Sequence, residues 1–240
     1  MFRLLHRLAC RAGFVAGRCP VCSRLTDTST DHLCPECADS LAPRSGGYCP
    51  GCGEIFGEED SPPTLCSDCR HTREPWDNFH FHNIYAGTLR DLILGYKFHS
   101  GVGHTHLLAE LAYNSFIEGG GETPDLIVPV PLHTKRLLWR GFNQSAELCR
   151  RLSKKMNRPI AHDALVRTRH TQPQTRLGMV ERQTNIKDAF RADPEMISRK
   201  SVLVVDDVYT TGATLRECTI TLRRAGAAQV DVLVLARAMQ

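Results

Sequence analysis

One segment, SVLVVDDVYTTGATL at residues 201–215, restricts the possible folds of this chain more than any other. It begins with the apolar run Val202–Val205, which is typical of a strand buried on both faces, as in parallel sheets. Two adjacent carboxylates, Asp206 and Asp207, come next, followed by a short loop and a helical pattern over Leu215–Arg224. Ligands of open parallel sheets bind beyond the carboxyl ends of the strands, so we expect the functional site here.

The residues after this strand suit a ribose phosphate. Asp206 and Asp207 offer adjacent acceptors for two vicinal hydroxyls. Small or hydroxyl-bearing residues form the loop that follows: Thr210, Thr211, Gly212, Ala213 and Thr214. Backbone N–H groups of such a loop can approach an anion closely, and the positive end of the following helix favours a phosphate. A simpler interpretation is that the acidic pair caps a helix and the threonines form a turn. A Walker loop is excluded, because its glycine and lysine spacing is absent.

The complete motif DDVYTTGAT, residues 206–214, resembles the motif with which type I phosphoribosyltransferases bind phosphoribosyl pyrophosphate (PRPP). The resemblance implies that Asp206 and Asp207 contact the ribose hydroxyls and that Thr210–Thr214 surround the 5′-phosphate. It also implies Mg²⁺ between the pyrophosphate and the ribose hydroxyls, in keeping with the few protein carboxylates that Mg²⁺ uses. Tyr209 occupies a variable position of the motif, where its ring could flank the ribose or face solvent.

Cysteines dominate the amino-terminal part of the chain. Of the 11 cysteines, eight form four CxxC pairs separated by 11, 11 and 13 residues. The pairs are Cys19/Cys22, Cys34/Cys37, Cys49/Cys52 and Cys66/Cys69. Each pair can present two thiolates to one ion, and two pairs complete a tetrahedral zinc site. A disulfide framework is the weaker explanation without a secretory signal, and a thioredoxin-like CxxC requires a βαβ context that this Gly/Pro-rich stretch lacks.

We therefore expect two structural Zn²⁺ ions, one held by the first two pairs and one by the last two. Crossed pairing, as in interleaved zinc folds, is the alternative. Four thiolates close each site, so catalysis by zinc is not expected. The short segment from Cys19 to Cys69 has few apolar residues, so we expect it to depend on the metal for its stability.

The remaining pattern predicts a parallel α/β sheet of the type I phosphoribosyltransferase kind behind a small Cys-rich zinc ribbon domain. Expected strands and helices alternate: strands at 79–86, 126–130, 201–207 and 229–236, and helices between 87 and 98 and at 104–116, 144–156 and 213–225. We divide the chain into an amphipathic helix (1–18), a double zinc ribbon (19–76) and a phosphoribosyltransferase-like domain (77–240). The first of these lacks an uninterrupted apolar core, so we expect no signal peptide, no transmembrane segment and a cytoplasmic protein.

A second chemical feature follows the strand at 126–130. Lys135, Arg136 and Arg140 cluster beyond its carboxyl end, where positive charge suits a departing pyrophosphate. The string RLLWRGFNQ, which begins at Arg136, resembles the ComF family of phosphoribosyltransferase-like proteins, including GntX-like members. That resemblance implies a link to DNA uptake in natural competence.

The segment Leu165–Phe190 resembles the central block of the same family. It is polar and lacks sustained periodicity, which is typical of a functional loop. Type I phosphoribosyltransferases close a flexible loop over the substrate, and this segment is the expected counterpart. Polar side chains suited to phosphates or a base are Gln172, Gln174, Arg176 and Arg182.

Charge is distributed unevenly. The whole chain carries a net charge of +4, but residues 133–200 contain 16 Lys and Arg against six Asp and Glu, so the remainder is acidic. Such a basic region suits phosphates or single-stranded DNA, with Trp139, Phe142 and Phe190 as the nearby aromatics for stacking. A solvated face around the PRPP site is the simpler interpretation.

Two hypotheses follow from these patterns. In the first, the protein is a phosphoribosyltransferase, a pentosyl-type glycosyltransferase. In the second, it is a non-catalytic module that senses PRPP or a nucleotide, or binds single-stranded DNA or a DNA-uptake helicase. The sequence indicates no phosphoribosyl acceptor and no catalytic residue.

Overall fold

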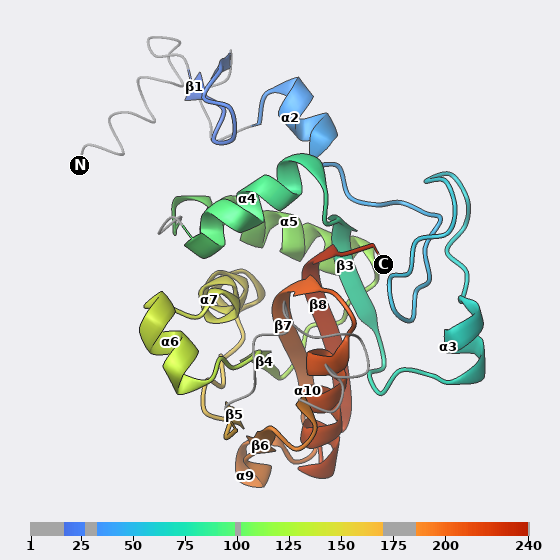
Figure 1. Cartoon of the computed structure of the whole chain (residues 1–240), viewed down its shortest axis with the longest axis vertical. Coiled ribbons are helices and arrows are strands. Elements are labelled where there is room, and N and C mark those ends of the chain that lie inside the picture. The colour runs from blue at the N-terminus through green and yellow to red at the C-terminus, as the bar shows by residue number, and fades with distance from the viewer. Residues whose placement is uncertain (1–16, 27–32, 99–101, 170–185, 240) are drawn as a thin grey trace.

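The computed structural model describes residues 17–26, 33–98, 102–169 and 186–239. Within these ranges, a parallel sheet with strand order β3-β8-β7-β4 forms the centre of the molecule (Figure 1). Its strands are β3 (Phe79–Ile84), β4 (Leu126–Pro129), β7 (Ser201–Tyr209) and β8 (Gln229–Arg237). The carboxyl ends of all four strands therefore lie at one edge, and the predicted parallel α/β class is confirmed.

Helices cover both faces of the sheet. Those around the sheet are α4 (Gly87–Phe98), η1 (Val102–His104), α5 (Thr105–Glu118), α6 (Thr134–Arg140), α7 (Gln144–Met156), α9 (Pro194–Ile197) and α10 (Ala213–Arg224). Leu203 and Val205 of β7 share a buried cluster with residues of α4, α5 and α7. Val202 and Val204 point to the opposite face and pack with residues of α10. Strand β7 is thus buried on both faces, as its apolar run predicts.

The two ends of the segment expected to be a loop form a short antiparallel pair of strands. Strands β5 (Leu165–Arg167) and β6 (Phe190–Ala192) pair antiparallel, so the ends of the 165–190 segment are structured. The polar residues singled out within it lie outside the described residues: Gln172, Gln174, Arg176 and Arg182.

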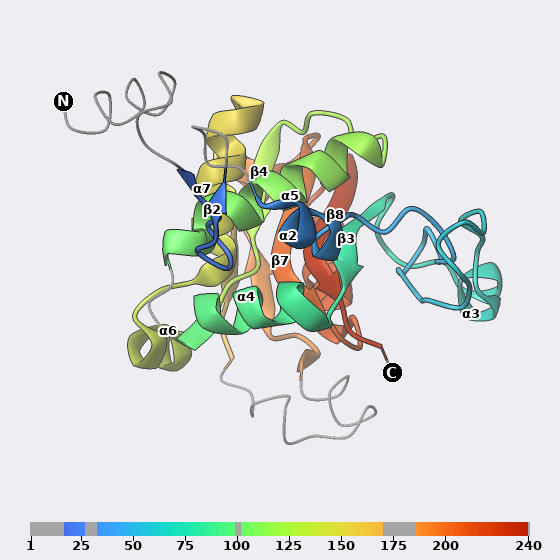
Figure 2. The same ribbon diagram turned by 90° about the horizontal axis from the view of Figure 1, so that it is seen from above.

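The cysteine-rich part of the chain contains β1 (Gly17–Arg18), β2 (Leu25–Thr26), α2 (Pro35–Ser40) and α3 (Ser67–His71). Figures 1 and 2 both show α2 over α4 and α3 beyond the β3 edge of the sheet. Residues 1–16 of the expected amino-terminal helix lie outside the described residues, whereas Gly17–Arg18 are extended rather than helical.

Two differences from the expected elements bear on the site. Strand β7 continues two residues beyond Asp207, to Tyr209, because both residues stay paired with β8. Helix α6 was not predicted. His133 starts it by accepting a hydrogen bond from the Lys135 N–H at 3.2 Å, and Gly141 ends it with φ 82°. No helix in the described part of the chain has the length and apolar character needed to cross a bilayer.

Candidate functional site at the carboxyl edge of the sheet

A small hollow of about 50 Å³, open to solvent, lies where β7 passes into α10. Its lining comes from Asp206, Val208, Tyr209, Thr210, Gly212, Ala213, Thr214 and Leu215. Gly212 is the N-cap of α10 and adopts φ 75°, a left-handed conformation that glycine tolerates best. The first N–H groups of a helix have no intrahelical acceptor, so the start of α10 offers donors to an anion.

Most of the predicted phosphate-binding loop therefore lines one cavity together with Asp206. Thr211 differs from its neighbours, because it does not belong to the lining and its Oγ1 is buried without a hydrogen bond. Its carbonyl accepts a hydrogen bond from Arg216 Nη1 at 2.7 Å. Thr211 thus contributes to the shape of the loop through its backbone.

Asp206 is the carboxylate that faces this cavity. Its Oδ1 accepts hydrogen bonds from Ser145 Oγ and from the backbone N–H of Asp207, both at 2.9 Å. Burial and the adjacent charge of Asp207 raise the pKa of Asp206 to about 7. A carboxyl group with this pKa changes its protonation state near neutral pH.

Asp207 lies in a different environment. The residue is only 6% exposed, its Oδ1 lies 2.9 Å from Lys97 Nζ, and its Oδ2 accepts a hydrogen bond from Gln144 Nε2 at 3.1 Å. The two aspartates are neighbours, but Asp207 is held by side chains from α4 and α7 while Asp206 faces the cavity.

Tyr209 forms the floor of the loop and does not face solvent, since it is 2% exposed. A Cβ atom on Gly212 would lie 2.2 Å from the Tyr209 hydroxyl, so the ring and the loop backbone are in direct contact. Arg216 Nη2 donates to that hydroxyl at 3.2 Å, and the guanidinium of Arg237 lies 4.6 Å from the ring centroid. Solvent exposure, one of the two positions considered for this ring, is wrong.

Basic residues adjoin the acidic pair. Burial and the neighbouring Arg136 lower the pKa of Arg140, whereas the carboxylates of the acidic pair oppose that shift. Burial also lowers the pKa of Arg167 in β5, and the charges of Arg136 and Asp206 both act on it. Arg140 and Arg167 thus lie within electrostatic range of Asp206, and Arg136 lies within range of both arginines. Lys135 and Arg136 are exposed on α6.

Four polar residues near the site escaped the sequence analysis: Lys97, Gln144, Ser145 and Arg167. Gln144 and Ser145 carried one available signal, because they begin the long helix predicted after the strand at 126–130, near the functional edge of the sheet. Lys97 lies at the end of a helix and Arg167 in a three-residue strand, and neither position marks a site in sequence.

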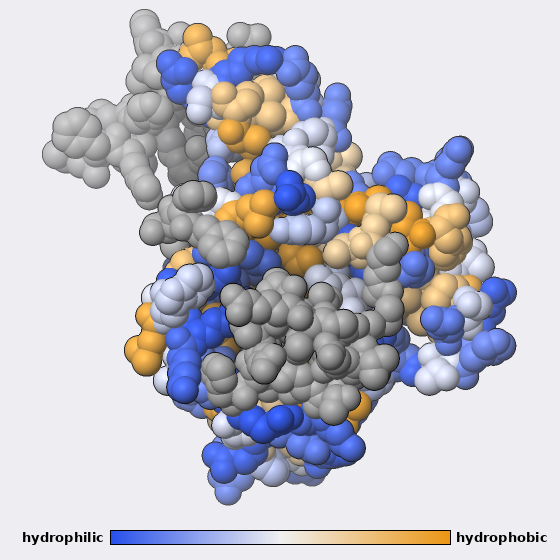
Figure 3. All heavy atoms as spheres, in the orientation of Figure 1, coloured by the Kyte–Doolittle hydropathy of each residue, from blue (hydrophilic) through white to orange (hydrophobic). Residues whose placement is uncertain are grey.

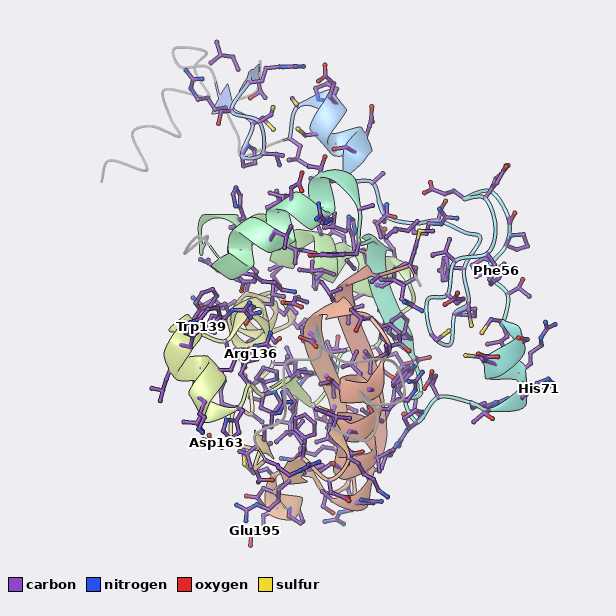
Figure 4. The ribbon with its side chains drawn as sticks, viewed as in Figure 1. Phe56, His71, Arg136, Trp139, Asp163 and Glu195 are labelled. Atoms are coloured by element: carbon purple, nitrogen blue, oxygen red, sulfur yellow. The ribbon has the colours of Figure 1, made fainter. Side chains whose placement is uncertain are left out.

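Helix α6 also carries exposed apolar side chains. Leu138 and Trp139 are 79% and 75% exposed. Figure 3 shows apolar surface over α6 at the left of the view, beside hydrophilic surface. Arg136 and Trp139 both project from this helix (Figure 4). The arrangement places an aromatic ring among cations on one short helix.

Two clusters of thiols stand apart from the hollow. The first cysteine site contains Cys19, Cys22, Cys34 and Cys37, and the second cysteine site contains Cys49, Cys52, Cys66 and Cys69. Within each site the sulfur atoms all lie within 4.8 Å of one another, so the CxxC pairs combine in sequence order, as predicted.

The geometry of both cysteine sites fits tetrahedral zinc. A Zn–S bond of about 2.3 Å corresponds to a sulfur–sulfur separation of about 3.8 Å. Cys22 and Cys34 have their sulfurs 3.6 Å apart, and Cys52 and Cys66 have theirs 3.8 Å apart. The chain thus contains two four-cysteine sites suited to structural zinc.

The thiols of the first cysteine site differ in acidity. Burial raises the pKa of Cys19, but backbone donors from Cys22, Cys34 and Val21 outweigh it and lower that pKa to about 6. Burial and the neighbouring thiols raise the pKa of Cys37 instead. Because four clustered thiolates repel one another, all of them ionise together only around a cation.

Comparison with known proteins covers both parts of the chain. Residues 104–240 match the phosphoribosyl transferase domain family, and residues 14–73 match the double zinc ribbon domain family. The DNA utilization protein YhgH of Escherichia coli is 35% identical over 93% of this chain and 91% of its own length. Competence protein F of Haemophilus influenzae is 31% identical over 92% and 97%, and competence protein ComFC of Bacillus subtilis is 26% identical over 86% and 85%.

Solved structures similar to this chain include the glutamine PRPP amidotransferase of B. subtilis in complex with ADP and GMP. It is 21% identical, covers 54% of this chain and 25% of its own, and aligns with a TM-score of 0.37, which is too low to add to the assignment.

Proposed function

The chain belongs to the ComF family, in which a double zinc ribbon precedes a phosphoribosyltransferase domain, and we propose that it binds PRPP with Mg²⁺ at the carboxyl edge of β7. The observation that carries the proposal is the hollow that combines the Asp206 carboxylate with the loop and the amino-terminal end of α10. A carboxylate suits the ribose hydroxyls and the helix end suits the 5′-phosphate, as the ligand requires.

The two aspartates take unequal parts in this proposal. Asp206 reaches the ribose hydroxyls directly, because it lines the cavity. Asp207 joins them when Lys97 turns away from it, and until then it raises the proton affinity of Asp206. Mg²⁺, when bound, supplies positive charge to the pyrophosphate, and Asp206 is the carboxylate of the cavity lining that is available to its water shell.

The reaction that this site supports is phosphoribosyl transfer. The bond between ribose C1 and pyrophosphate breaks with its electron pair on the pyrophosphate oxygen, a bond from the acceptor to C1 forms, and the acceptor loses a proton. Negative charge grows on the pyrophosphate as it leaves, and cations stabilise that charge. Arg140 is a proposed cation because it lies within electrostatic range of both carboxylates, and Arg136 and Lys135, exposed on the same helix, are the other two.

The relatives' names supply the biological setting of the proposal. Competence protein F and DNA utilization protein YhgH indicate a role in the uptake or use of DNA, and this chain shares most of its length with both. We extend that role to this protein, with a DNA-uptake helicase as the protein partner. Residence in the cytoplasm, where PRPP is available, completes the proposal.

A specific observation favours single-stranded DNA as a second ligand. Trp139 is 75% exposed on a helix that also presents Lys135 and Arg136. Proteins that hold single strands combine backbone-neutralising cations with aromatic rings on which bases stack. Binding of DNA without turnover of PRPP is the alternative function.

One experiment separates the two functions. The pure protein is incubated with PRPP and Mg²⁺, with and without candidate acceptors including single-stranded DNA, and pyrophosphate is measured. Release that depends on an acceptor supports the enzyme. If a parallel titration shows PRPP binding but no acceptor gives release, the non-catalytic module is supported. Absence of PRPP binding contradicts both the enzyme and the PRPP-sensing module and leaves only DNA binding.

A further inference from the structure

Arg237, the last residue of β8, joins the second cysteine site to the 210–214 loop. The residue is 3% exposed. Its Nε donates to the carbonyl of Cys52 at 3.2 Å, and its Nη1 donates to the carbonyl of Thr210 at 3.0 Å. Nη2 pairs with Glu54 at 2.7 Å. One planar guanidinium therefore fixes the backbone of a cysteine pair and the backbone of the loop at the same time.

Arg216 makes a second connection of the same kind. Its Nε and Nη2 pair with both carboxylate oxygens of Glu74, each at 2.6 Å. Its Nη1 donates to the carbonyl of Thr211. Glu74 belongs to the segment that leads from α3 of the second cysteine site into β3. Bidentate pairs of this type are strong and directional, so they hold the loop at a fixed position.

The Cys49–Cys52 turn packs closely against aromatic residues in the region bounded by Arg237 and Arg216. A Cβ on Gly53 would lie 2.7 Å from the Phe79 ring and 3.5 Å from Arg237, so the Cys49–Cys52 turn rests directly on the domain. Trp76 Nε1 donates to the carbonyl of Gly51 at 2.8 Å, and its ring meets Tyr209 edge to face at 6.1 Å. The turn, the aromatic rings and the loop thus form one contiguous contact.

The first cysteine site reaches the domain elsewhere. Val21 and Leu33 pack against the cluster that includes α4, and the carbonyl of Leu41 lies 2.8 Å from His82 Nε2. This contact is on the α4 and α5 face of the sheet, whereas the loop leads into α10 on the other face. The first site is therefore an internal control for the second.

We propose that metal at the second cysteine site and ligand on the 210–214 loop are thermodynamically coupled through the positioning residues Arg237 and Arg216. The inference deepens the proposed function and rests on it for the identity of the ligand. Metal fixes the Cys49–Cys52 turn, the turn fixes the two guanidinium groups, and these hold the loop carbonyls so that the amides face the phosphate. Coupling is reciprocal, so a ligand on the loop raises the affinity of the second cysteine site for its metal.

Single-site variants test the metal's effect on the loop without any ligand. Cys69→Ser empties the second site and Cys37→Ser empties the first, and each variant should retain one zinc. Hydrogen exchange is measured for residues 209–214 in the full-length proteins. We expect exchange there to rise about tenfold or more in Cys69→Ser and to match the wild type in Cys37→Ser. Equal exchange of residues 209–214 in the two variants overturns the proposal. It is also overturned if, in Cys69→Ser, exchange in the central part of β7 rises as much as exchange in the loop.

Conservative variants test the connecting residue. Arg237→Lys keeps the charge but loses the planar fork of donors, so loop exchange should rise with both zinc ions retained. Arg223→Lys is the matched control, because Arg223 pairs with Asp77, in the same linker as Glu74, and donates to the carbonyl of Ala228. Unchanged loop exchange in Arg237→Lys contradicts the proposal.

Zinc release tests reciprocity with PRPP and Mg²⁺ as the probe. In Cys37→Ser, which retains the second site, the probe should raise several-fold the concentration of a zinc-selective chelator that removes half of the zinc at equilibrium. In Cys69→Ser it should leave that concentration unchanged. An equal effect on both sites overturns the coupling. A different outcome is that calorimetry detects no PRPP binding to the wild type while loop exchange still depends on the second cysteine site. That result refutes PRPP as the ligand but supports the structural connection between the second cysteine site and the loop.

Discussion

Lys97 Nζ lies 2.9 Å from Asp207 Oδ1, and the two side chains are only 17% and 9% exposed. This ion pair connects the carboxyl end of β7 to the last turn of α4. It separates the roles of two aspartates that are adjacent in sequence, because Asp207 has an internal partner and Asp206 faces the cavity. The pair therefore contributes to stability as well as to the charge of the site.

We expect Asp207→Asn and Lys97→Met each to lower the free energy of unfolding by about 3 kcal/mol, since each leaves one buried charge without its partner. The double variant should lose much less than the sum of the two, because neither charge remains. Urea denaturation of the four proteins measures the coupling. Additive losses would show that the pair contributes no interaction energy.

Asp206→Asn should stabilise the ligand-free protein above neutral pH. The pKa of Asp206 is raised from 3.8 to about 7, so the folded state binds the proton more tightly than the unfolded state. Its contribution is fully present below about pH 4 and is lost as the pH rises through 7. Asn keeps an oxygen for Ser145 and the Asp207 N–H. The difference in unfolding free energy between variant and wild type should widen by about 1 kcal/mol from pH 6 to pH 8. Parallel pH profiles contradict this assignment.

Gly212→Ala should damage the loop through contact as well as strain. The new methyl group would lie 2.2 Å from the Tyr209 hydroxyl at a residue with φ 75°. Gly120 has the same φ with no atom within 4 Å of a Cβ, so Gly120→Ala isolates the conformational cost of about 1 kcal/mol. Thermal unfolding should show a clearly larger loss for Gly212→Ala. Equal losses of thermal stability in the two variants would mean that the Tyr209 ring moves away from the new methyl group at no cost in free energy.

Zinc should be removable from both cysteine sites. Under reducing conditions a chelator should release two zinc ions per chain and unfold the cysteine-rich region, because structural zinc contributes about 10–16 kcal/mol at neutral pH. Cys149→Ala is the control, since Cys149 is buried in α7 away from both sites, and it should release the same amount. Release of no zinc from the wild type refutes the assignment of both sites.

Trp139→Ala should weaken binding of single-stranded DNA by about 5- to 100-fold, the effect of one lost stacking contact. Phe56→Ala is the matched control, because Phe56 is 53% exposed and lies on the opposite side of the molecule (Figure 4). Fluorescence anisotropy at several salt concentrations measures both variants. A flat salt response, or equal effects of the two substitutions, argues against α6 as the DNA surface.

The sequence predicted those parts of the molecule in which local pattern and tertiary structure agree. The apolar run before Asp206 fixed β7 as a central strand, and the CxxC spacing gave both cysteine sites in the right order. A strand buried on both faces requires a continuous apolar run, and tetrahedral coordination by cysteines favours CxxC pairs, so both features can be recognised from residue spacing.

The missed features depend on contacts between distant segments. Lys97 meets Asp207 across 110 positions, and Arg237 meets Cys52 across 185. The sequence around an arginine or a lysine does not indicate which carboxylate or carbonyl group its side chain will contact. The sequence left the position of Tyr209 open for the same reason, because its burial depends on Trp76 and Phe79 from the linker and β3.

Calorimetric titration of the full-length protein with PRPP and Mg²⁺ measures whether Asp206 and the 210–214 loop bind PRPP. The wild type should bind with 1:1 stoichiometry, Asp206→Asn should lose at least about tenfold in affinity, equal to about 1.4 kcal/mol, and Glu195→Gln should match the wild type. Glu195 is the control because it is exposed in α9. This helix precedes the amino-terminal end of β7, whereas the candidate site lies at the carboxyl end. No heat of binding in the wild type, or equal affinity of Asp206→Asn and the wild type, would contradict the account.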